Sequence, residues 1–239
     1  METRDTVSGQ DHLDQVLVKF AEGDRTAGFD ALVKLWRAGF RPPSTFQVPR
    51  PYGRSAVDHA IVVGFAQGPL WADLIGGSPS QVSRACELAA DLLVHLQRQP
   101  PGDAAAAPRS ASGQVGRSDR RPGELAEDLS RAFPGCADRV RTLAARLDES
   151  LARGQGVLVA AHGDYHPKNV IVTDTTATMI DLDTYGAREP AFDVGYAIGQ
   201  LLVMSQLRLG RLGPGFAAAE RFWSGYSRAG SARWDRVSL

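Results

Sequence analysis

Residues 157–183 read VLVAAHGDYHPKNVIVTDTTATMIDLD and carry the strongest structural signal in the sequence. Three short runs of small apolar and β-branched residues lie within this stretch, at 157–161, 169–173 and 177–181. A polar segment from His162 to Asn169 separates the first run from the second, and residues 174–176 form a loop of hairpin length before the third. Such runs, bounded by turn residues, are typical of strands. We therefore predict a strand, a tight polar loop and a β-hairpin.

Two carboxylates and an amide converge in this predicted arrangement. If residues 173 and 177 close the hairpin, Asn169 lies directly opposite Asp181, with Cβ atoms about 5 Å apart. Pro167 helps the preceding loop to turn, which brings Asp164 toward the same point. Carboxylate and amide oxygens are the ligands that hard cations prefer, so the pattern indicates a Mg²⁺-type site rather than a zinc site.

The remaining elements are simpler to predict. A β-type run at 15–20 is followed by a helical pattern of apolar residues that Gly39 ends, and a second buried strand is expected at 60–65. Further helical patterns lie at 80–96, 125–133 and 137–153. The segment 99–123 is rich in Pro, Gly, Ser and Ala and has almost no large apolar side chain, so we expect it to form a disordered surface loop.

These motifs together resemble those of the aminoglycoside phosphotransferase and choline kinase-like family. HGDYHPKN, at 162–169, resembles the family's catalytic loop H-x-D-x-x-x-x-N, and IDLD, at 180–183, resembles its metal-binding motif. EPAFD, at 189–193, is similar to the start of the family's next helix. Upstream, VLVK at 16–19 resembles the nucleotide-lobe lysine strand, VPRP at 48–51 the segment before the hinge strand, and FAQG at 65–68 the hinge.

The resemblance implies an α+β, two-lobed protein kinase-like fold. We expect residues 1–66 to form a reduced N-terminal nucleotide-binding lobe with a small sheet and one helix. Residues 67–239 would form a mainly helical C-terminal lobe that carries the catalytic hairpin and binds the acceptor. The implied activity is transfer of the γ-phosphate of ATP to a hydroxyl of a small molecule, such as an aminoglycoside-like compound or an amino alcohol.

Roles for individual residues are implied by the same resemblance and follow the general scheme of phosphoryl transfer. Asp164 would orient the acceptor hydroxyl and take its proton, and His162 would brace the catalytic loop. Asn169 and Asp181 would bind Mg²⁺ that bridges the ATP phosphates. Lys19 would contact the α- and β-phosphates.

Three further acidic residues are considered in this scheme. Asp30 is the best-placed acid on the first helix to pair with Lys19. Asp193 either accepts hydrogen bonds from the backbone of the catalytic loop or simply stabilises the first turn of its own helix. Asp183 is expected to be a solvated loop residue rather than a second metal ligand.

Two alternative functions stay open at this point. Only 18 residues precede Lys19, which is too few for a full first hairpin and a glycine-rich phosphate loop. The chain could therefore be a catalytically silent, kinase-like nucleotide-binding protein, or its true start could lie upstream. A metal-dependent hydrolase built on His162, Asp164 and His166 is the third hypothesis, and the sequence offers no second histidine cluster to complete its ligands.

Composition excludes several other classes of partner. Among 239 residues, 27 Lys and Arg balance 27 Asp and Glu, which argues against a nucleic-acid-binding protein. The longest apolar run, 60–66, is far shorter than a membrane span, and the polar N-terminus lacks a secretory pattern, so we expect a cytoplasmic protein without a membrane partner. Cys86 and Cys136 are expected to stay unpaired. The sequence does not indicate the acceptor, the choice of ATP over GTP, or the oligomeric state.

Overall fold

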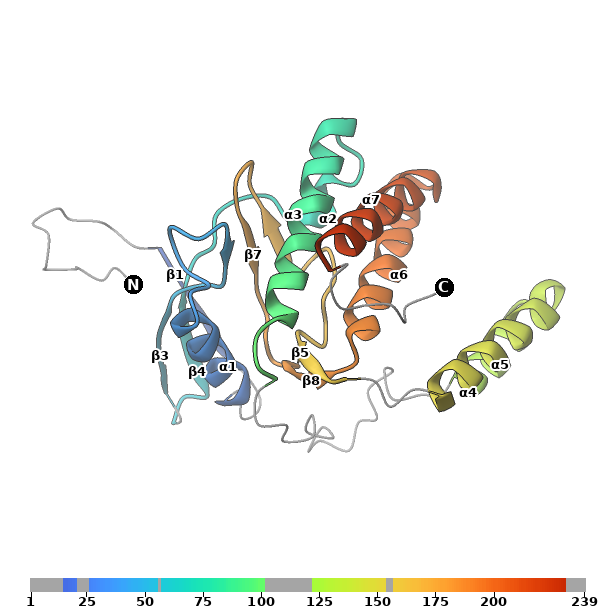
Figure 1. The fold of residues 1–239 in the computed structure, drawn as a ribbon, viewed down its shortest axis with the longest axis horizontal. Helices are drawn as coiled ribbons and strands as arrows, with labels where there is room; N and C mark the ends of the chain where they lie inside the picture. The colour runs from blue at the N-terminus through green and yellow to red at the C-terminus, as the bar shows by residue number, and fades with distance from the viewer. Residues whose placement is uncertain (1–14, 21–25, 56, 102–121, 154–156, 231–239) are drawn as a thin grey trace, which may run out of the picture. The chain divides into compact units, whose positions relative to one another are not determined.

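Figure 1 shows the fold in a computed structural model, which describes residues 15–20, 26–55, 57–101, 122–153 and 157–230. The chain divides into two compact units. The larger unit combines residues 1–104 with residues 158–239, and the smaller unit comprises residues 105–157.

A three-stranded antiparallel sheet forms the N-terminal part of the larger unit. Its strands are β1 (Val16–Phe20), β3 (Pro51–Ser55) and β4 (Ala60–Gly64), and β4 lies between the other two. The predicted strands at 15–20 and 60–65 are therefore confirmed and lie next to each other, with Lys19 opposite Ile61.

Helix α1 (Thr26–Arg37) connects this sheet to the rest of the unit. Its apolar residues at helical spacing face inward, and Phe29, Leu32 and Leu35 are buried. Gly39 ends the turn with a φ of 103°, a left-handed conformation that favours glycine. The predicted helix and its end at Gly39 are both confirmed.

Two further sheets hold the segment that decides the fold. Strand β7 (Ala177–Met179) lies between β2 (Phe46–Gln47) and β6 (Val170–Val172), while β5 (Val159–Ala161) pairs antiparallel with β8 (Gly186–Arg188). Every residue of β5, β6 and β7 is buried. The polar loop 162–169 is therefore fixed at both ends by strands in the core.

The hairpin register differs from the prediction by one residue. Val170 pairs with Met179, so Asn169 lies opposite Ile180, whose N–H donates to the Asn169 carbonyl at 2.9 Å, and not opposite Asp181. The cause is the threonine-rich turn: the Thr173 hydroxyl accepts the backbone N–H groups of residues 175 and 176 and closes a two-residue loop. A slip of one residue moves a side chain to the other face of a strand, so Asn169 and Asp181 are not a cross-strand pair.

Helices form most of the remaining part of the larger unit. They are α2 (Trp71–Leu74), α3 (Pro79–Gln97), α6 (Pro190–Leu209) and α7 (Gly213–Gly230). α7 packs against both α3 and α6 (Figure 1). Ser78 caps α3 in a reciprocal arrangement with Gln81, and the predicted apolar stripe of α3 is buried, including the free thiol of Cys86.

The smaller unit is a helical hairpin of α4 (Pro122–Ala132) and α5 (Ala137–Arg153), joined by the short helix η2 (Pro134–Cys136). The two predicted helices of this region are confirmed. The loop expected at 99–123 lies mostly outside the described residues, and its last two residues already belong to α4. None of the helices in the described part of the chain is long and apolar enough to cross a membrane.

Candidate active site

His162 supports the polar loop from inside the protein. Its side chain is completely buried; Nε2 lies 2.9 Å from the Ile180 carbonyl oxygen, and Nδ1 accepts the N–H of Asp164 at 3.3 Å. Burial lowers the pKa of His162, although the charge of Asp193 opposes this shift. The imidazole is therefore neutral, with its proton on Nε2, and it links the loop to the strand end that precedes Asp181.

Asp193 holds the start of the same loop. Its carboxylate accepts the backbone N–H of His162 at 2.8 Å and that of Gly163 at 3.0 Å, and the side chain is fully buried. Burial raises the pKa of Asp193, and the nearby His162 and the two backbone donors lower it. The prediction that this residue accepts hydrogen bonds from the loop backbone is thus confirmed.

Gly163 has a structural reason to be glycine. Its φ is 84°, and a Cβ atom at this position would collide with the carbonyl oxygen of Thr184. The Thr184 hydroxyl in turn donates to the His162 carbonyl at 3.0 Å. The loop backbone is therefore held on both sides before it reaches Asp164.

Asp164 and Asn169 are brought together at the other side of the loop. The Asn169 amide nitrogen lies 3.0 Å from Oδ2 of Asp164 and 3.0 Å from its carbonyl oxygen. Nε2 of His166 lies 3.4 Å from the same Oδ2. Burial raises the pKa of Asp164, but the hydrogen bonds and charge of His166 and the hydroxyl of Tyr196 outweigh it, and the net pKa is lower than usual. Asp164 is therefore ionised at neutral pH.

Tyr196 is the site residue that the sequence analysis missed. It lies one turn after Asp193 on α6, its ring meets that of His166 edge-on at 5.8 Å, and burial together with the charge of Asp164 raises its pKa. The signal for it was present in the sequence, because a residue three positions after Asp193 lies on the same face of a helix.

Lys19 pairs with Asp181, not with Asp30. Nζ of Lys19 lies 3.1 Å from Oδ1 of Asp181, and Asp181 has a φ of 65° where the chain leaves β7. The Asp30 carboxylate lies 3.1 Å from the guanidinium of Arg54 instead. The expected Lys19–Asp30 pair is therefore wrong. Residues 28 and 32 of α1 line the site, and residue 30, halfway between them in the sequence, lies on another side of the helix.

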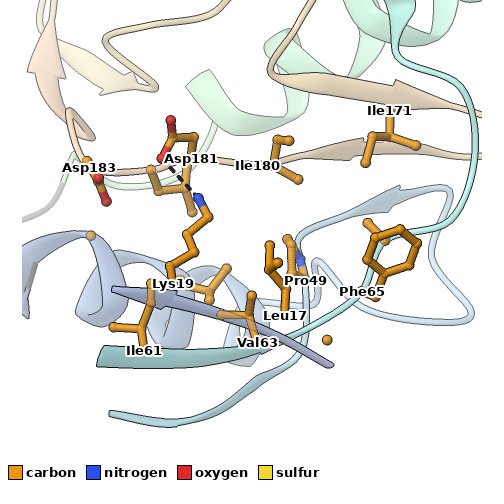
Figure 2. Close-up of a pocket in the computed structure, with 15 residues that line it drawn as sticks. Leu17, Lys19, Pro49, Ile61, Val63, Phe65, Ile171, Ile180, Asp181 and Asp183 are labelled. Carbon is orange, nitrogen blue, oxygen red and sulfur yellow. Dashed lines mark hydrogen bonds and ion pairs between the residues drawn. The ribbon is translucent and has the colours of Figure 1, made fainter. Parts of the chain in front are cut away.

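An apolar pocket opens beside the Lys19–Asp181 pair. Figure 2 shows this pair at one end of the pocket and Phe65 at the other. The apolar lining comes from the sheet of β1, β4 and β3, from strand β6 and from the segments beside them. It includes Leu17, Pro49, Ile61, Val63, Phe65, Ile171, Ile180 and Leu182. A slot with apolar walls and a charged end suits a flat ring that carries an anionic group.

The donor atoms near the loop fit a hard cation better than zinc. Asn169 donates through its amide nitrogen, which leaves its amide oxygen for a cation, and Asp181 supplies carboxylate oxygen. Both ring nitrogens of His162 are engaged within the protein, so this histidine does not fit a zinc site. In the described ranges, no group of three or more His, Cys, Asp or Glu side chains is arranged to hold a metal ion.

A family of known proteins matches most of the chain. The family described as "Phosphotransferase enzyme family" matches residues 11–237. No curated protein matches the chain.

The solved structures that resemble the chain include two of a glucosamine kinase and one of an aminoglycoside phosphotransferase. A glucosamine kinase (crystal form A) has a TM-score of 0.62 and 21% identity, covering 91% of this chain and 62% of that chain. A glucosamine kinase in complex with glucosamine, ADP and inorganic phosphate has a TM-score of 0.58 and 22% identity. The match covers 91% of this chain and 64% of that chain. An aminoglycoside-3'-phosphotransferase of type VIII has a TM-score of 0.56 and 19% identity, covering 94% and 79%.

At these identities the resemblance shows the fold. The predicted α+β, protein kinase-like fold with a mostly helical C-terminal part is confirmed. The chain spans less than two thirds of the length of the two glucosamine kinase structures.

Proposed function

Because the chain belongs to the phosphotransferase enzyme family, we propose that it transfers the γ-phosphoryl group of ATP to a hydroxyl of a small molecule. One observation carries this proposal: an ionised Asp164 is hydrogen-bonded to Asn169 in the loop that leads into the hairpin ending at Asp181. This combination of base, amide and second carboxylate is what phosphoryl transfer to an alcohol needs.

The nucleotide would bind in the apolar pocket. Its base would lie between the apolar walls, and Phe65 marks the end of the pocket farthest from the charged pair (Figure 2). Lys19 is only part-exposed, so its ammonium group would meet the phosphates in partly desolvated surroundings. In this scheme residues 1–66 form the nucleotide-binding lobe, and residues 67–239 form the catalytic and acceptor-binding lobe.

Asn169 and Asp181 would hold a Mg²⁺ ion, through the amide oxygen of one and the carboxylate of the other. When bound, such an ion neutralises charge on the phosphate oxygens during transfer. Asp181 would have to exchange its direct contact with Lys19 for this role, so both side chains would turn toward the incoming phosphates.

Asp164 would act on the acceptor. Its carboxylate would accept a hydrogen bond from the acceptor hydroxyl and take that proton as the hydroxyl oxygen forms a bond with the γ-phosphorus. The bond from the γ-phosphorus to the bridging oxygen breaks at the same time, and ADP leaves with that oxygen. Asn169 and His166 hold the carboxylate in place before the acceptor arrives.

The acceptor class follows from the proteins that share the fold. We propose an amino sugar, an aminoglycoside-like compound or an amino alcohol, since glucosamine and aminoglycosides are named for the similar structures. Fold alone does not select one of these.

Phosphate transfer to a panel of acceptors tests the proposal. The chain would be incubated with γ-labelled ATP, Mg²⁺ and, in turn, glucosamine, an aminoglycoside, choline or ethanolamine. We expect labelled product with at least one acceptor and none after chelation with EDTA. Binding of ATP without transfer to any acceptor would favour a silent nucleotide-binding protein, and no binding of ATP would contradict both. Stoichiometric zinc in the purified protein would favour a hydrolase instead.

A further inference from the structure

Helix α1 comes close to the segment after β7 at Gly28. A Cβ atom added to Gly28 would lie 2.5 Å from Oδ1 of Asp183, 3.1 Å from its Cα and 3.3 Å from its N. Real Cβ atoms essentially never approach another heavy atom as closely as the first of these distances. The carboxylate end of Asp183 could turn aside for a methyl group, whereas its Cα and N lie closer than most real Cβ contacts and would have to move by a few tenths of an ångström.

Glycine is otherwise a poor choice inside a helix. Gly28 lies in the first turn of a 12-residue helix. By contrast, Gly195 and Gly199 in α6 have no heavy atom within 4 Å of the place where a Cβ would lie. The need for glycine at position 28 thus comes from the contact with Asp183, whereas the two glycines of α6 meet no such obstacle.

The contact lies in the wall of the nucleotide pocket. Gly28, Lys19, Asp181 and Asp183 all line this pocket, and Figure 2 shows Asp183 on the same side as the Lys19–Asp181 pair. Asp181 is two residues before Asp183 and has a left-handed backbone. A shift of Asp183 would therefore be transmitted through one intervening residue to the carboxylate that faces Lys19.

No acid of α1 takes part in this connection among the described residues. Asp30 is engaged with Arg54, and Lys19 is engaged with Asp181. At this point of the pocket wall, the Gly28 backbone of α1 lies close to Asp183.

We propose that Gly28 is a positioning residue of the nucleotide site: it allows α1 to rest on Asp183 and so holds the backbone of Asp181 where its carboxylate can reach Lys19 or a bound Mg²⁺ ion. This inference rests on the proposed function, because it assigns the contact to the binding of a magnesium–nucleotide complex. It adds a residue of the pocket wall that has no side chain of its own and acts through Asp183 and Asp181.

The test compares Gly28→Ala with Gly199→Ala. The dissociation constant of Mg·ADP is measured by calorimetry, and the unfolding midpoint is measured for each protein. We expect Gly28→Ala to weaken Mg·ADP binding several-fold, since a misplacement of about 1 Å can cost about 10²-fold and the displacement here is a few tenths of an ångström. Gly199→Ala should bind like the unsubstituted chain. Equal dissociation constants for Gly28→Ala and the unsubstituted chain would overturn the proposal.

A second substitution separates the proposed contact from general damage to the helix. In an Asp183→Ala background the atom nearest to the added methyl is gone, so Gly28→Ala should have a smaller effect on Mg·ADP binding there. An undiminished effect in that background would contradict the role of Asp183.

The result that would refute the proposed function differs from the result that would refute the positioning role. If the unsubstituted chain does not bind Mg·ADP, the proposed function fails, and the positioning role is then judged from a crystal structure of Gly28→Ala. A Lys19 Nζ to Asp181 distance that stays near 3.1 Å would refute the positioning role, and a separated pair would support it.

Discussion

The loop between β5 and β6 has two sides that differ in burial and in bonding. On the inner side, His162 and Tyr165 are fully buried, and the Tyr165 hydroxyl donates to the Ala89 carbonyl at 2.6 Å. On the outer side, the side chain of Asp164 is 35% exposed and that of His166 is 15% exposed. The inner side chains are bound to backbone groups of the core, whereas the outer ones are bound mainly to each other. One short segment thus combines a rigid support with a reactive surface.

This difference indicates which substitutions should affect folding and which should affect chemistry. Removing a buried polar partner leaves unpaired groups in the core and lowers stability. Removing an exposed carboxylate that is held for chemistry should lower turnover and leave the fold intact. The predictions below test this separation, beginning with the largest effect.

Asp164→Asn should abolish most of the turnover. A positioned general base contributes about 10²–10⁴ to the rate, and the amide cannot take the acceptor proton. The unfolding midpoint should stay close to that of the unsubstituted chain, because the side chain is part-exposed and the amide can still bond to Asn169. Phosphate transfer and thermal unfolding of the same preparation measure the two effects, and turnover at the original rate would reject Asp164 as the base.

Asp193→Ala should lower the free energy of unfolding by about 3 kcal/mol. Two buried N–H groups, of His162 and Gly163, lose their acceptor, and each unpaired group costs about 1–3 kcal/mol. Asp193→Asn, which has the same shape and keeps one acceptor oxygen, should lose less. Denaturant titration compares the three proteins. Equal stability of Asp193→Ala and the unsubstituted chain would show that the Asp193 carboxylate does not stabilise the loop.

Lys19→Met should weaken the use of ATP by about tenfold to a hundredfold in kcat/KM, since a hydrogen bond from a charged group contributes about 1.5–3 kcal/mol. Stability should change by less than about 1 kcal/mol, because the pair with Asp181 is part-exposed. Steady-state kinetics with varied ATP, together with an unfolding curve, checks both statements. A large loss of stability with unchanged kinetics would show that Lys19 serves the fold and not the binding of ATP.

Stability should decrease as the pH falls below about 6.5. The pKa of His162 is lowered by burial, so below the unfolded value of about 6.5 the unfolded chain binds a proton that the folded chain does not. This costs up to about 1.4 kcal/mol per pH unit. His95, whose pKa burial also lowers, acts in the same direction. The raised pKa of Asp193 acts in the opposite direction at more acidic pH, and the lowered pKa of Asp164 matters only below about 3.8.

His162→Gln isolates the contribution of the buried imidazole. The dependence of the unfolding free energy on pH between about 7 and 5.5 should become shallower in this variant, while the contribution of His95 remains. The same slope in both proteins would mean that His162 is not held neutral in the folded state.

Local patterns were sufficient to predict β1, β4, the three strands around the polar loop and most of the long helices, but not the strands β2, β3 and β8 or the short helix α2. The alternating and helical apolar patterns depend on neighbours in the sequence, and α3 buries the stripe that its sequence predicts. The register of the hairpin was not predictable in the same way, because the choice between a three-residue and a two-residue turn depends on one hydroxyl of Thr173. A single side-chain hydrogen bond therefore changed which residue faces Asn169.

The partner of Lys19 also lay beyond sequence reasoning. Asp30 and Asp181 are both acids, and which of them reaches Lys19 depends on the rotation of α1 and on the left-handed backbone at Asp181. α1 and Asp181 belong to segments more than a hundred residues apart in the sequence, and these segments come close at Gly28 and Asp183. Spacing along the chain predicts which residues can share a helix face, but it does not predict how that face is turned toward a distant strand.

The most direct test of the account concerns the divalent ion at Asn169 and Asp181. Asn169 is the single asparagine of the sequence, so protein labelled with ¹⁵N-asparagine gives one side-chain amide signal in a nuclear magnetic resonance spectrum. Addition of Mn²⁺ with ADP should broaden this signal beyond detection, and Mg²⁺ with ADP should shift it without broadening. A side-chain signal that keeps its position and width in saturating Mn²⁺ and ADP would contradict the account.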